Sequence, residues 1–190
     1  RIELEVRGWG VNEESWGVEK VVLPGDPTHP AVWEDLSRAL GRTYRSVLKF
    51  NLTIATTFVD SGAHTQAVYR WVANEGRKRK RVFAIKGFGG QGRPLLGRPS
   101  LGKPTKAVLI PLGVDEAKTT IYHQLQADKP EAGKSAPGFI HFPAGFGYDA
   151  DHFDQLAAEE RLLDQRQGVA KYIWRKKKGV LRNEALDLAV

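Results

Sequence analysis

The sequence predicts a mixed α/β fold with a central sheet flanked by helices, and three features support this prediction. The chain opens with a segment in which Ile2, Leu4 and Val6 alternate with charged residues, as in a half-buried strand. Residues 50–59 form an almost uncharged run rich in β-branched side chains, which is typical of a central strand buried on both faces. Short apolar segments then alternate with amphipathic ones, the order expected of strands and helices in one α/β domain.

The remaining elements follow from periodicity and from turn residues. A second strand over residues 15–23 is expected to form a hairpin with the first, and Pro24 and Gly25 then break the chain. A Gly/Pro-rich loop over residues 87–106 is long enough to suggest a functional or mobile segment. No linker or repeat divides the chain, so we expect a single domain over residues 1–190. The pattern predicts helices at about 30–40, 64–74, 114–125, 150–158 and from 183, strands at 82–85, 107–112 and 139–142, and a hairpin within 162–174.

Composition narrows the classes of function. Hydrophobic residues make up 41% and charged residues 27% of the 190 positions, as in a globular domain with its own core. No apolar run approaches the roughly 18 residues that would suggest a membrane span. Because there is no cysteine, disulfides, thiolate metal sites and cysteine nucleophiles are excluded. Any metal would be bound through oxygen or imidazole, which favours Mg²⁺ or Mn²⁺ where carboxylates meet.

The charge pattern favours a polyanionic partner. The formal net charge is +7, and residues 76–114 contain ten Lys or Arg residues and no acidic residue. A second basic cluster follows Trp174. A solvated basic surface is the alternative interpretation, but we expect contacts with the DNA backbone that weaken steeply with salt. The residues predicted to make them are Arg77, Lys78, Arg79, Lys80, Arg81, Arg93, Arg98, Arg175, Lys176 and Lys177.

Asp60 is the strongest single candidate for a catalytic or metal-binding residue. It stands where a predicted buried strand gives way to a helix, and Gly62 allows a tight turn. Ligands in α/β proteins bind at the carboxyl ends of central strands, and a carboxylate exposed there can bind a hard metal ion. The alternative is that Asp60 caps the helix that follows.

Asp187 lies on the last predicted helix, and Glu184 precedes it by about one turn. A spacing of three places both carboxylates on one helix face, where they could serve a metal. A solvated acidic face is the alternative, with Asn183 as the N-cap of the helix.

Weaker candidates are better explained by local structural roles. No GK[ST] ends the glycine run at residues 87–92, so neither a P-loop nor a dinucleotide site is expected there. We expect local hydrogen bonds or helix caps, rather than metal or phosphate contacts, for His64, Asp115, His141 and the group Asp149, Asp151, His152 and Asp154.

Several segments, in order along nearly the whole chain, resemble the C-terminal nuclease region of lambda-like bacteriophage terminase large subunits. Each segment alone is weakly diagnostic, whereas the ordered set is specific. They are VRGWG with ESWGVEKVVLPGDP, VDSGAHTQAVY, RVFAIKGFGGQGRP, PLGVDEAKTTIYHQL, GFIHFP with FDQLAAEE, and RNEALD.

This resemblance implies a ribonuclease H-like fold and an endodeoxyribonuclease that cuts concatemeric viral double-stranded DNA during packaging. It implies phosphodiester hydrolysis with two divalent ions, Mg²⁺ or Mn²⁺. The Asp of the DSG segment is Asp60 and the Asp of RNEALD is Asp187, with Glu184 as a further possible catalytic residue. The implied partners are the small terminase subunit and the capsid portal, and the implied location is the cytoplasm of the infected host cell.

The chain also departs from the family pattern. The family has an Asp on a strand just before the RIELEV segment, and Glu3 and Glu5 are poor substitutes for it. We therefore expect that strand and the ATPase motor domain to lie upstream, and the isolated piece to be impaired in cutting. The alternative is a non-catalytic module that binds DNA or the portal within the packaging motor.

Overall fold

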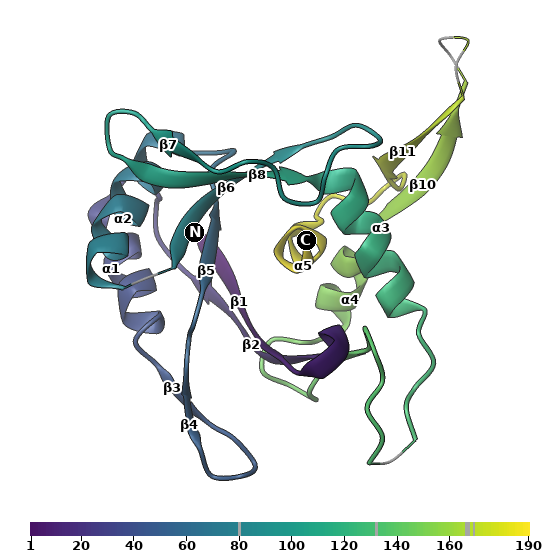
Figure 1. The fold of residues 1–190 in the computed structure, drawn as a ribbon, viewed down its shortest axis with the longest axis horizontal. Coiled ribbons are helices and arrows are strands. Elements are labelled where there is room, and N and C mark those ends of the chain that lie inside the picture. The colour runs from purple at the N-terminus through teal and green to yellow at the C-terminus, as the bar shows by residue number, and fades with distance from the viewer. Residues whose placement is uncertain (80, 132, 166–167, 169) are drawn as a thin grey trace. The chain divides into compact units, whose positions relative to one another are not determined.

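The computed structural model describes residues 1–79, 81–131, 133–165, 168 and 170–190 of the chain (Figure 1). These residues form helices and mixed sheets, which confirms the predicted mixed α/β class and is consistent with a ribonuclease H-like fold.

The described residues fall into two compact units. The first unit contains residues 1–2, 22–88 and 96–112, and the second contains residues 3–21, 89–95 and 113–190. Among the described residues, no helix has the length and apolar character needed to cross a bilayer.

A four-stranded mixed sheet forms the centre of the first unit. Its strand order is β5-β6-β8-β7. Strands β5 (Thr57–Asp60) and β6 (Val82–Phe88) are parallel, and β7 (Ser100–Gly102) is antiparallel to β8 (Ala107–Gly113). A parallel pair requires a crossover connection, which here contains a helix. The carboxyl end of β5 therefore runs directly into that connection.

Two amphipathic helices lie beside each other in the first unit, and α2 packs against this sheet (Figure 1). Helix α1 (Pro30–Ala39) begins with a proline, and α2 (Thr65–Lys78) forms the β5–β6 crossover. Their buried positions recur every three or four residues, as one helix face requires. Burying each Val or Leu side chain among them contributes about 1.5–3 kcal/mol. The core so formed includes Val32, Leu36, Val68, Val72, Val82 and Ala84.

The long central strand predicted over residues 50–59 is wrong. The segment instead contains β4 (Asn51–Thr53), which pairs with β3 (Thr43–Arg45) as a separate antiparallel hairpin, and β5 begins only at Thr57. All three residues of β4 are exposed. β-Branched residues favour an extended backbone without specifying which sheet the strand joins or whether it is buried. The predicted loop at 87–106 also differs, because β7 lies within it.

The second unit contains a three-stranded sheet of order β1-β2-β9. Strands β1 (Ile2–Trp9) and β2 (Ser15–Leu23) are joined through the 3₁₀ turn η1 (Val11–Glu13), as the predicted hairpin requires. Strand β9 (Ile140–His141) is parallel to β2. The single strand predicted for residues 139–142 is thus confirmed in a shorter form.

Helices and a second hairpin complete this unit. Helix α3 (Val114–Leu125) has the predicted bounds, and α4 (Ala150–Leu156) and α5 (Glu184–Ala189) lie near theirs. Strands β10 (Glu159–Asp164) and β11 (Lys171–Lys176) form the predicted antiparallel hairpin. One core cluster joins α3, β9, α4 and α5 through Ile121, Ile140, Leu156, Ala185 and Leu186.

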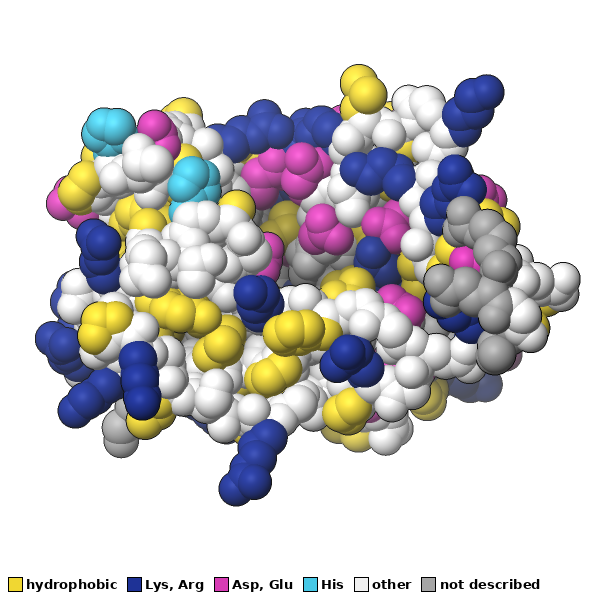
Figure 2. Space-filling view, turned by 90° about the horizontal axis from the view of Figure 1, so that it is seen from above, with side chains coloured by type: hydrophobic (Ala, Val, Ile, Leu, Met, Phe, Trp, Pro, Cys, Tyr) yellow, Lys and Arg dark blue, Asp and Glu magenta, His cyan; other side chains and the backbone are white. Residues whose placement is uncertain are grey.

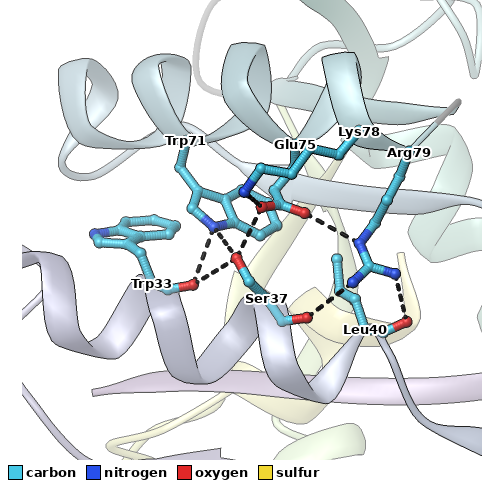
Figure 3. A network of polar contacts seen from close by, with 7 residues as sticks. All are labelled: Trp33, Ser37, Leu40, Trp71, Glu75, Lys78 and Arg79. Atoms are coloured by element: carbon cyan, nitrogen blue, oxygen red, sulfur yellow. Dashed lines mark hydrogen bonds and ion pairs between the residues drawn. The ribbon is translucent and has the colours of Figure 1, made fainter.

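A buried carboxylate joins α1 to α2 in the first unit (Figure 3). Glu75 of α2 is 2% exposed and accepts hydrogen bonds from the Ser37 hydroxyl, the Lys78 ammonium and the Arg79 guanidinium, each at 3.0 Å. Arg79 also donates to the carbonyl oxygens of Ser37 and Leu40, both at 3.2 Å. The C-terminal ends of the two helices are therefore linked through one carboxylate and one guanidinium.

The ionised form of Glu75 is favoured despite its burial. Burial raises the pKa of a carboxyl group, but here the hydrogen bonds from Lys78, Ser37 and Arg79 outweigh it and hold the pKa of Glu75 below its usual value of 4.5. The unfolded chain therefore binds this proton more readily than the folded chain does. The stabilisation is present above the unfolded pKa and is lost as pH falls through the folded pKa.

We expect Glu75→Ala to lower the free energy of unfolding by about 2–4 kcal/mol at neutral pH, because the substitution leaves two cations and a hydroxyl without their buried acceptor. Chemical denaturation measured by circular dichroism tests this. Glu34→Ala on the exposed side of α1 is the matched control and should change stability by less than about 0.5 kcal/mol. The difference between Glu75→Ala and the parent should shrink as pH falls below about 4.5. A difference independent of pH would contradict the ionised state assigned to Glu75.

Candidate active site

Asp60 is the last residue of β5 and lies opposite Ile85 of the parallel strand β6. Its side chain is exposed, and its Oδ1 accepts a hydrogen bond from the Gly62 N–H at 2.9 Å. The second oxygen, Oδ2, has no hydrogen-bond partner among the residues that the structure describes. Asp60 is not the N-cap of α2, because that position belongs to His64. One carboxylate oxygen is thus oriented by the backbone, and the other can bind a ligand.

The turn after Asp60 is anchored firmly to β6. Ser61 is fully buried and makes two hydrogen bonds to the Ile85 carbonyl oxygen, from its N–H at 2.9 Å and from its hydroxyl at 2.7 Å. The Thr65 hydroxyl then donates to the Ser61 carbonyl oxygen at 2.7 Å. These contacts connect the end of β5 to the first turn of α2. They fix the backbone that carries Asp60.

Gly62 leaves room for the Asp60 carboxylate. A Cβ atom at position 62 would lie 3.2 Å from Oδ2 and 3.4 Å from Oδ1 of Asp60, closer than most Cβ contacts. A side chain at position 62 would therefore crowd the Asp60 carboxylate. The glycine predicted from the sequence to allow a tight turn therefore also sets the position of the candidate ligand.

His64 occupies the N-cap position of α2 in a left-handed conformation, with φ of 52° and no side-chain capping hydrogen bond. Its imidazole makes no hydrogen bond with the described residues, so the expected local bond is not found. With Thr28 and Arg70 it lines an open depression on the first unit, near the start of α2. Contact of His64 with a water or a phosphate stays a prediction.

Asp187 and Glu184 lie on α5 of the second unit, as expected from the sequence. Asn183 is at the N-cap position, but its amide donates to the Glu159 carboxylate at 3.0 Å and to Asp187 Oδ1 at 3.3 Å instead of capping the helix. The Arg182 guanidinium donates to Glu184 at 3.1 Å. Both carboxylates therefore lie within a polar network, and the Asp187 side chain is exposed.

Other acidic residues of the second unit are used in ion pairs. Glu3 binds Arg182 at 2.6 Å and lies 3.7 Å from the Lys20 ammonium. Glu159 binds the Lys118 ammonium at 2.7 Å. These pairings give Glu3 and Glu159 structural roles.

A set of three metal ligands is not assembled in the parts of the chain that the structure describes. No group of three or more His, Asp or Glu side chains there lies close enough to hold one ion. Asp60 belongs to the first unit and Asp187 to the second. Mg²⁺ is commonly bound by one or two carboxylates and several waters, so the donors present fit a hard ion. That Asp60 and Asp187 serve the same metal centre stays a prediction.

The weaker acidic candidates have local roles. Asp115 is not a cap, since α3 has Gly113 at its N-cap position. Its Oδ2 instead accepts from the Gly90 N–H at 3.1 Å. Asp149 caps α4 by accepting from the His152 N–H at 2.9 Å, as expected. These carboxylates fix loop and helix starts.

The two buried or half-buried histidines also have structural roles. His141 Nε2 lies 2.7 Å from the Glu14 carboxylate, and its ring stacks on Trp16 with a centroid distance of 4.9 Å. His152 is 1% exposed, and burial, the largest cause, holds its pKa below 6.5. The contacts of His141 agree with its structural interpretation. For His152 the expected local side-chain hydrogen bond is not found, because neither of its ring nitrogens has a partner among the described residues.

Some of the basic residues predicted to contact DNA are hydrogen-bonded to other protein groups, and others are exposed. Arg79 is held against α1 by Glu75, Ser37 and Leu40, and Lys78 also binds Glu75. Arg93 donates to the Gly89 carbonyl oxygen, and Lys176 to that of Leu181. Figure 2 shows Lys and Arg side chains at many separate points of one face. Lys80 lies outside the described residues, and the remaining predicted cations, all exposed, are Arg77, Arg81, Arg98, Arg175 and Lys177.

Sequence reasoning missed two residues that position Asp60. Ser61 and Thr65 are small hydroxyl residues, and their hydrogen bonds tie the end of β5 to β6 and α2. A hydroxyl residue directly after the last residue of a strand was the available signal. It could not be interpreted without the β6 carbonyl oxygen that accepts its hydrogen bond, since Ile85 is 24 residues away.

The comparisons with known proteins are consistent over the whole chain. The chain is 31% identical over 193 residues to the terminase large subunit of Escherichia phage lambda, in an alignment that covers all of this chain and 29% of that protein. It is 29% identical over 192 residues to the terminase large subunit of Enterobacteria phage P21, again covering all of this chain and 29% of the relative. No solved structure matches the chain. The family described as the terminase large subunit gpA endonuclease domain matches residues 1–190, and the chain therefore belongs to this family.

Proposed function

We propose that this chain is a metal-dependent endonuclease domain that cuts double-stranded viral DNA during packaging. One structural observation supports this most directly. Asp60 stands at the carboxyl end of a parallel strand, with one carboxylate oxygen bound to the Gly62 backbone and the other without a partner among the described residues. Membership of the endonuclease-domain family supplies the reaction class.

Asp60 and Asp187 are the proposed metal ligands, with Glu184 as a supplementary one. Both Asp side chains are exposed, and carboxylate oxygens suit Mg²⁺ or Mn²⁺. When bound, two such ions supply an activated water and stabilise the leaving oxygen of the phosphodiester. The assignment of Asp187 rests on its place in the RNEALD segment.

The residues around Asp60 hold its carboxylate in place before any ligand binds. Ser61 and Thr65 fix the backbone, and Gly62 donates to Oδ1, so little reorganisation remains when Oδ2 binds an ion. Such pre-organisation is what a catalytic site requires of its supporting residues. The exposed cations would neutralise DNA phosphates and contribute affinity without reading sequence.

In its biological setting, the substrate we propose is concatemeric phage DNA in the cytoplasm of the infected host. The small terminase subunit and the capsid portal are the proposed protein partners. The chain spans 29% of the length of each curated relative, so these partners belong to the whole protein that the relatives represent.

A non-catalytic DNA- or portal-binding module is the second candidate. One observation favours it: no three-ligand metal site is assembled among the described residues. Salt-dependent DNA binding without metal-dependent cutting would distinguish this candidate from the nuclease.

We expect Asp60→Asn to reduce plasmid cleavage at least about 100-fold in Mn²⁺ or Mg²⁺, because losing a metal ligand removes several kcal/mol of transition-state stabilisation. The assay measures nicking and linearisation of supercoiled plasmid, in a chain extended by the upstream family strand. Asp128→Asn, in an exposed loop, is the matched control and should cut like the parent. Equal cutting by the parent and Asp60→Asn would show that the site is assigned wrongly.

Gly62→Ala tests the space around the carboxylate. The added Cβ would crowd Oδ2 at 3.2 Å, so a higher Mn²⁺ concentration should be needed for half-maximal cleavage. The backbone at Gly62 is not in the left-handed region, so thermal stability should change little. Gly76→Ala, where a Cβ meets no atom within 4 Å, is the control. An unchanged metal requirement would contradict the role given to Gly62.

Neutralising two exposed cations tests the DNA contacts. Because each phosphate contact contributes about 0.9 to the slope of log affinity against log salt, Arg175→Gln with Lys177→Gln should reduce the slope by up to about 1.8. Fluorescence anisotropy with a labelled duplex in EDTA measures this. Lys129→Gln, outside both basic runs, should leave the slope as it is. If the double variant also retains the parent slope, these residues do not contact phosphates.

A further inference from the structure

The β3–β4 hairpin of the first unit has a well-defined tip. It spans residues 43–53 and extends away from the four-stranded sheet (Figure 1). At its tip the Ser46 N–H donates to the Phe50 carbonyl oxygen at 2.9 Å, and the Lys49 N–H donates to the Ser46 carbonyl oxygen at 2.8 Å. The Ser46 hydroxyl accepts from the Phe50 N–H at 3.0 Å, and Lys49 is left-handed with φ of 66°. These bonds hold the tip in one turn conformation.

The tip exposes large apolar side chains to water. Val47 is 98% exposed, Leu48 73%, Phe50 65% and Leu52 54%. Turn tips usually contain Gly, Asn, Asp, Pro or Ser, because those residues adopt turn geometry and interact with water. Apolar side chains gathered on an exposed surface instead mark a binding surface. Nothing in the local backbone requires apolar residues at positions 47 and 48.

The hairpin has two chemically different faces. Tyr44 pairs with Leu52 across the strands, and Arg45 pairs with Asn51. Because side chains alternate along a strand, Tyr44 and Leu52 lie on one face and the polar pair lies on the opposite face. Phe50 directly precedes β4, at the tip. The ribbon therefore has an apolar face and tip beside a cationic, polar face.

Charge identifies the chemistry of the partner. The hairpin, residues 43–53, contains no Asp or Glu, and its charged residues are Arg45 and Lys49. Arg45 and Lys49 are exposed and form no ion pair within the described ranges of the chain. A surface that is both cationic and apolar complements a polyanion with flat apolar groups, which describes DNA. A protein partner would have to supply the acidic groups as well as the apolar ones.

We propose that the β3–β4 hairpin binds duplex DNA, with Arg45 and Lys49 contacting phosphates and Leu48 and Phe50 wedged against the bases in the minor groove. Apolar wedges at base steps are a known means of gripping and bending a duplex. The inference rests on the proposed function, because it takes DNA as the substrate. It adds a DNA contact outside the two basic segments, at residues 76–114 and after Trp174. Its consequence is local unstacking of bases at the hairpin.

The experiment uses the 190-residue chain in EDTA with a short duplex that contains one 2-aminopurine, whose fluorescence rises when its base step unstacks. The parent should give this rise at positions under the hairpin.

Leu48→Ser with Phe50→Ser should abolish the rise and weaken binding about tenfold with an unchanged salt slope. Arg45→Gln with Lys49→Gln should reduce the slope, and Phe50→Trp should preserve the rise. Val11→Ser with Leu181→Ser removes equally exposed apolar residues elsewhere and is the control.

The proposal would be overturned if the Leu48→Ser, Phe50→Ser variant bound DNA and raised the fluorescence as the parent does. It would also be overturned if this variant kept DNA binding but lost binding to a terminase or portal protein. Circular dichroism melting curves that match the parent would show that each variant is folded. If the strand-extended chain fails to cut plasmid in Mn²⁺ or Mg²⁺, the proposed nuclease function fails. If the parent binds DNA and raises the 2-aminopurine fluorescence while the hairpin variants do the same, only the hairpin inference fails.

Discussion

The first unit depends on a carboxylate that is buried and must remain ionised. Glu75 connects α2 to α1 through Ser37 and binds Lys78 and Arg79 on its own helix. A buried charge is tolerated only when its hydrogen-bonding capacity is filled, so this carboxylate favours the packing of α1 and α2 that brings Ser37 to Glu75. Since α2 follows Asp60 after a short turn, the same constraint limits where the end of β5 can lie.

The position of the candidate site depends on how firmly the end of β5 is held. Ser61 is buried and bound to β6, and Thr65 ties the first turn of α2 to the same turn. Asp60 is exposed in the midst of these fixed groups, with a single backbone hydrogen bond on one oxygen. A carboxylate held in this way has lost conformational freedom before an ion arrives, which lowers the entropic cost of binding. The site's supporting structure therefore belongs to the fold of the first unit.

The basic residues of this chain include side chains with structural contacts and the proposed DNA contacts, and sequence alone does not separate the two. Arg79 lies within a run that looks uniformly suited to DNA, yet its guanidinium donates to Glu75, Ser37 and Leu40. Its neighbour Arg77 is exposed and has no such set of partners among the residues that the structure describes. Neutralising Arg79 would therefore disturb the α1–α2 contact as well as any DNA contact. Binding studies on this run need stability measurements beside them.

Local patterns predicted the elements that have strong periodicity. Helix α3 has the predicted bounds, and the β10–β11 hairpin, β8 and α5 lie close to theirs. The run at residues 50–59 failed because extended propensity does not determine strand partners, and those depend on distant residues. For the same reason Asp60 could be found by its place before a helix, whereas the role of Ser61 depended on Ile85 of another strand.

We propose that Asp60 binds the divalent ion at which DNA is cut. The most direct measurement is an anomalous difference map from crystals of the strand-extended chain soaked in Mn²⁺. We expect a peak within about 2.0–2.2 Å of an Asp60 carboxylate oxygen, with Asp187 also a ligand. Catalytically active protein whose Mn²⁺ peaks lie away from Asp60 would contradict it.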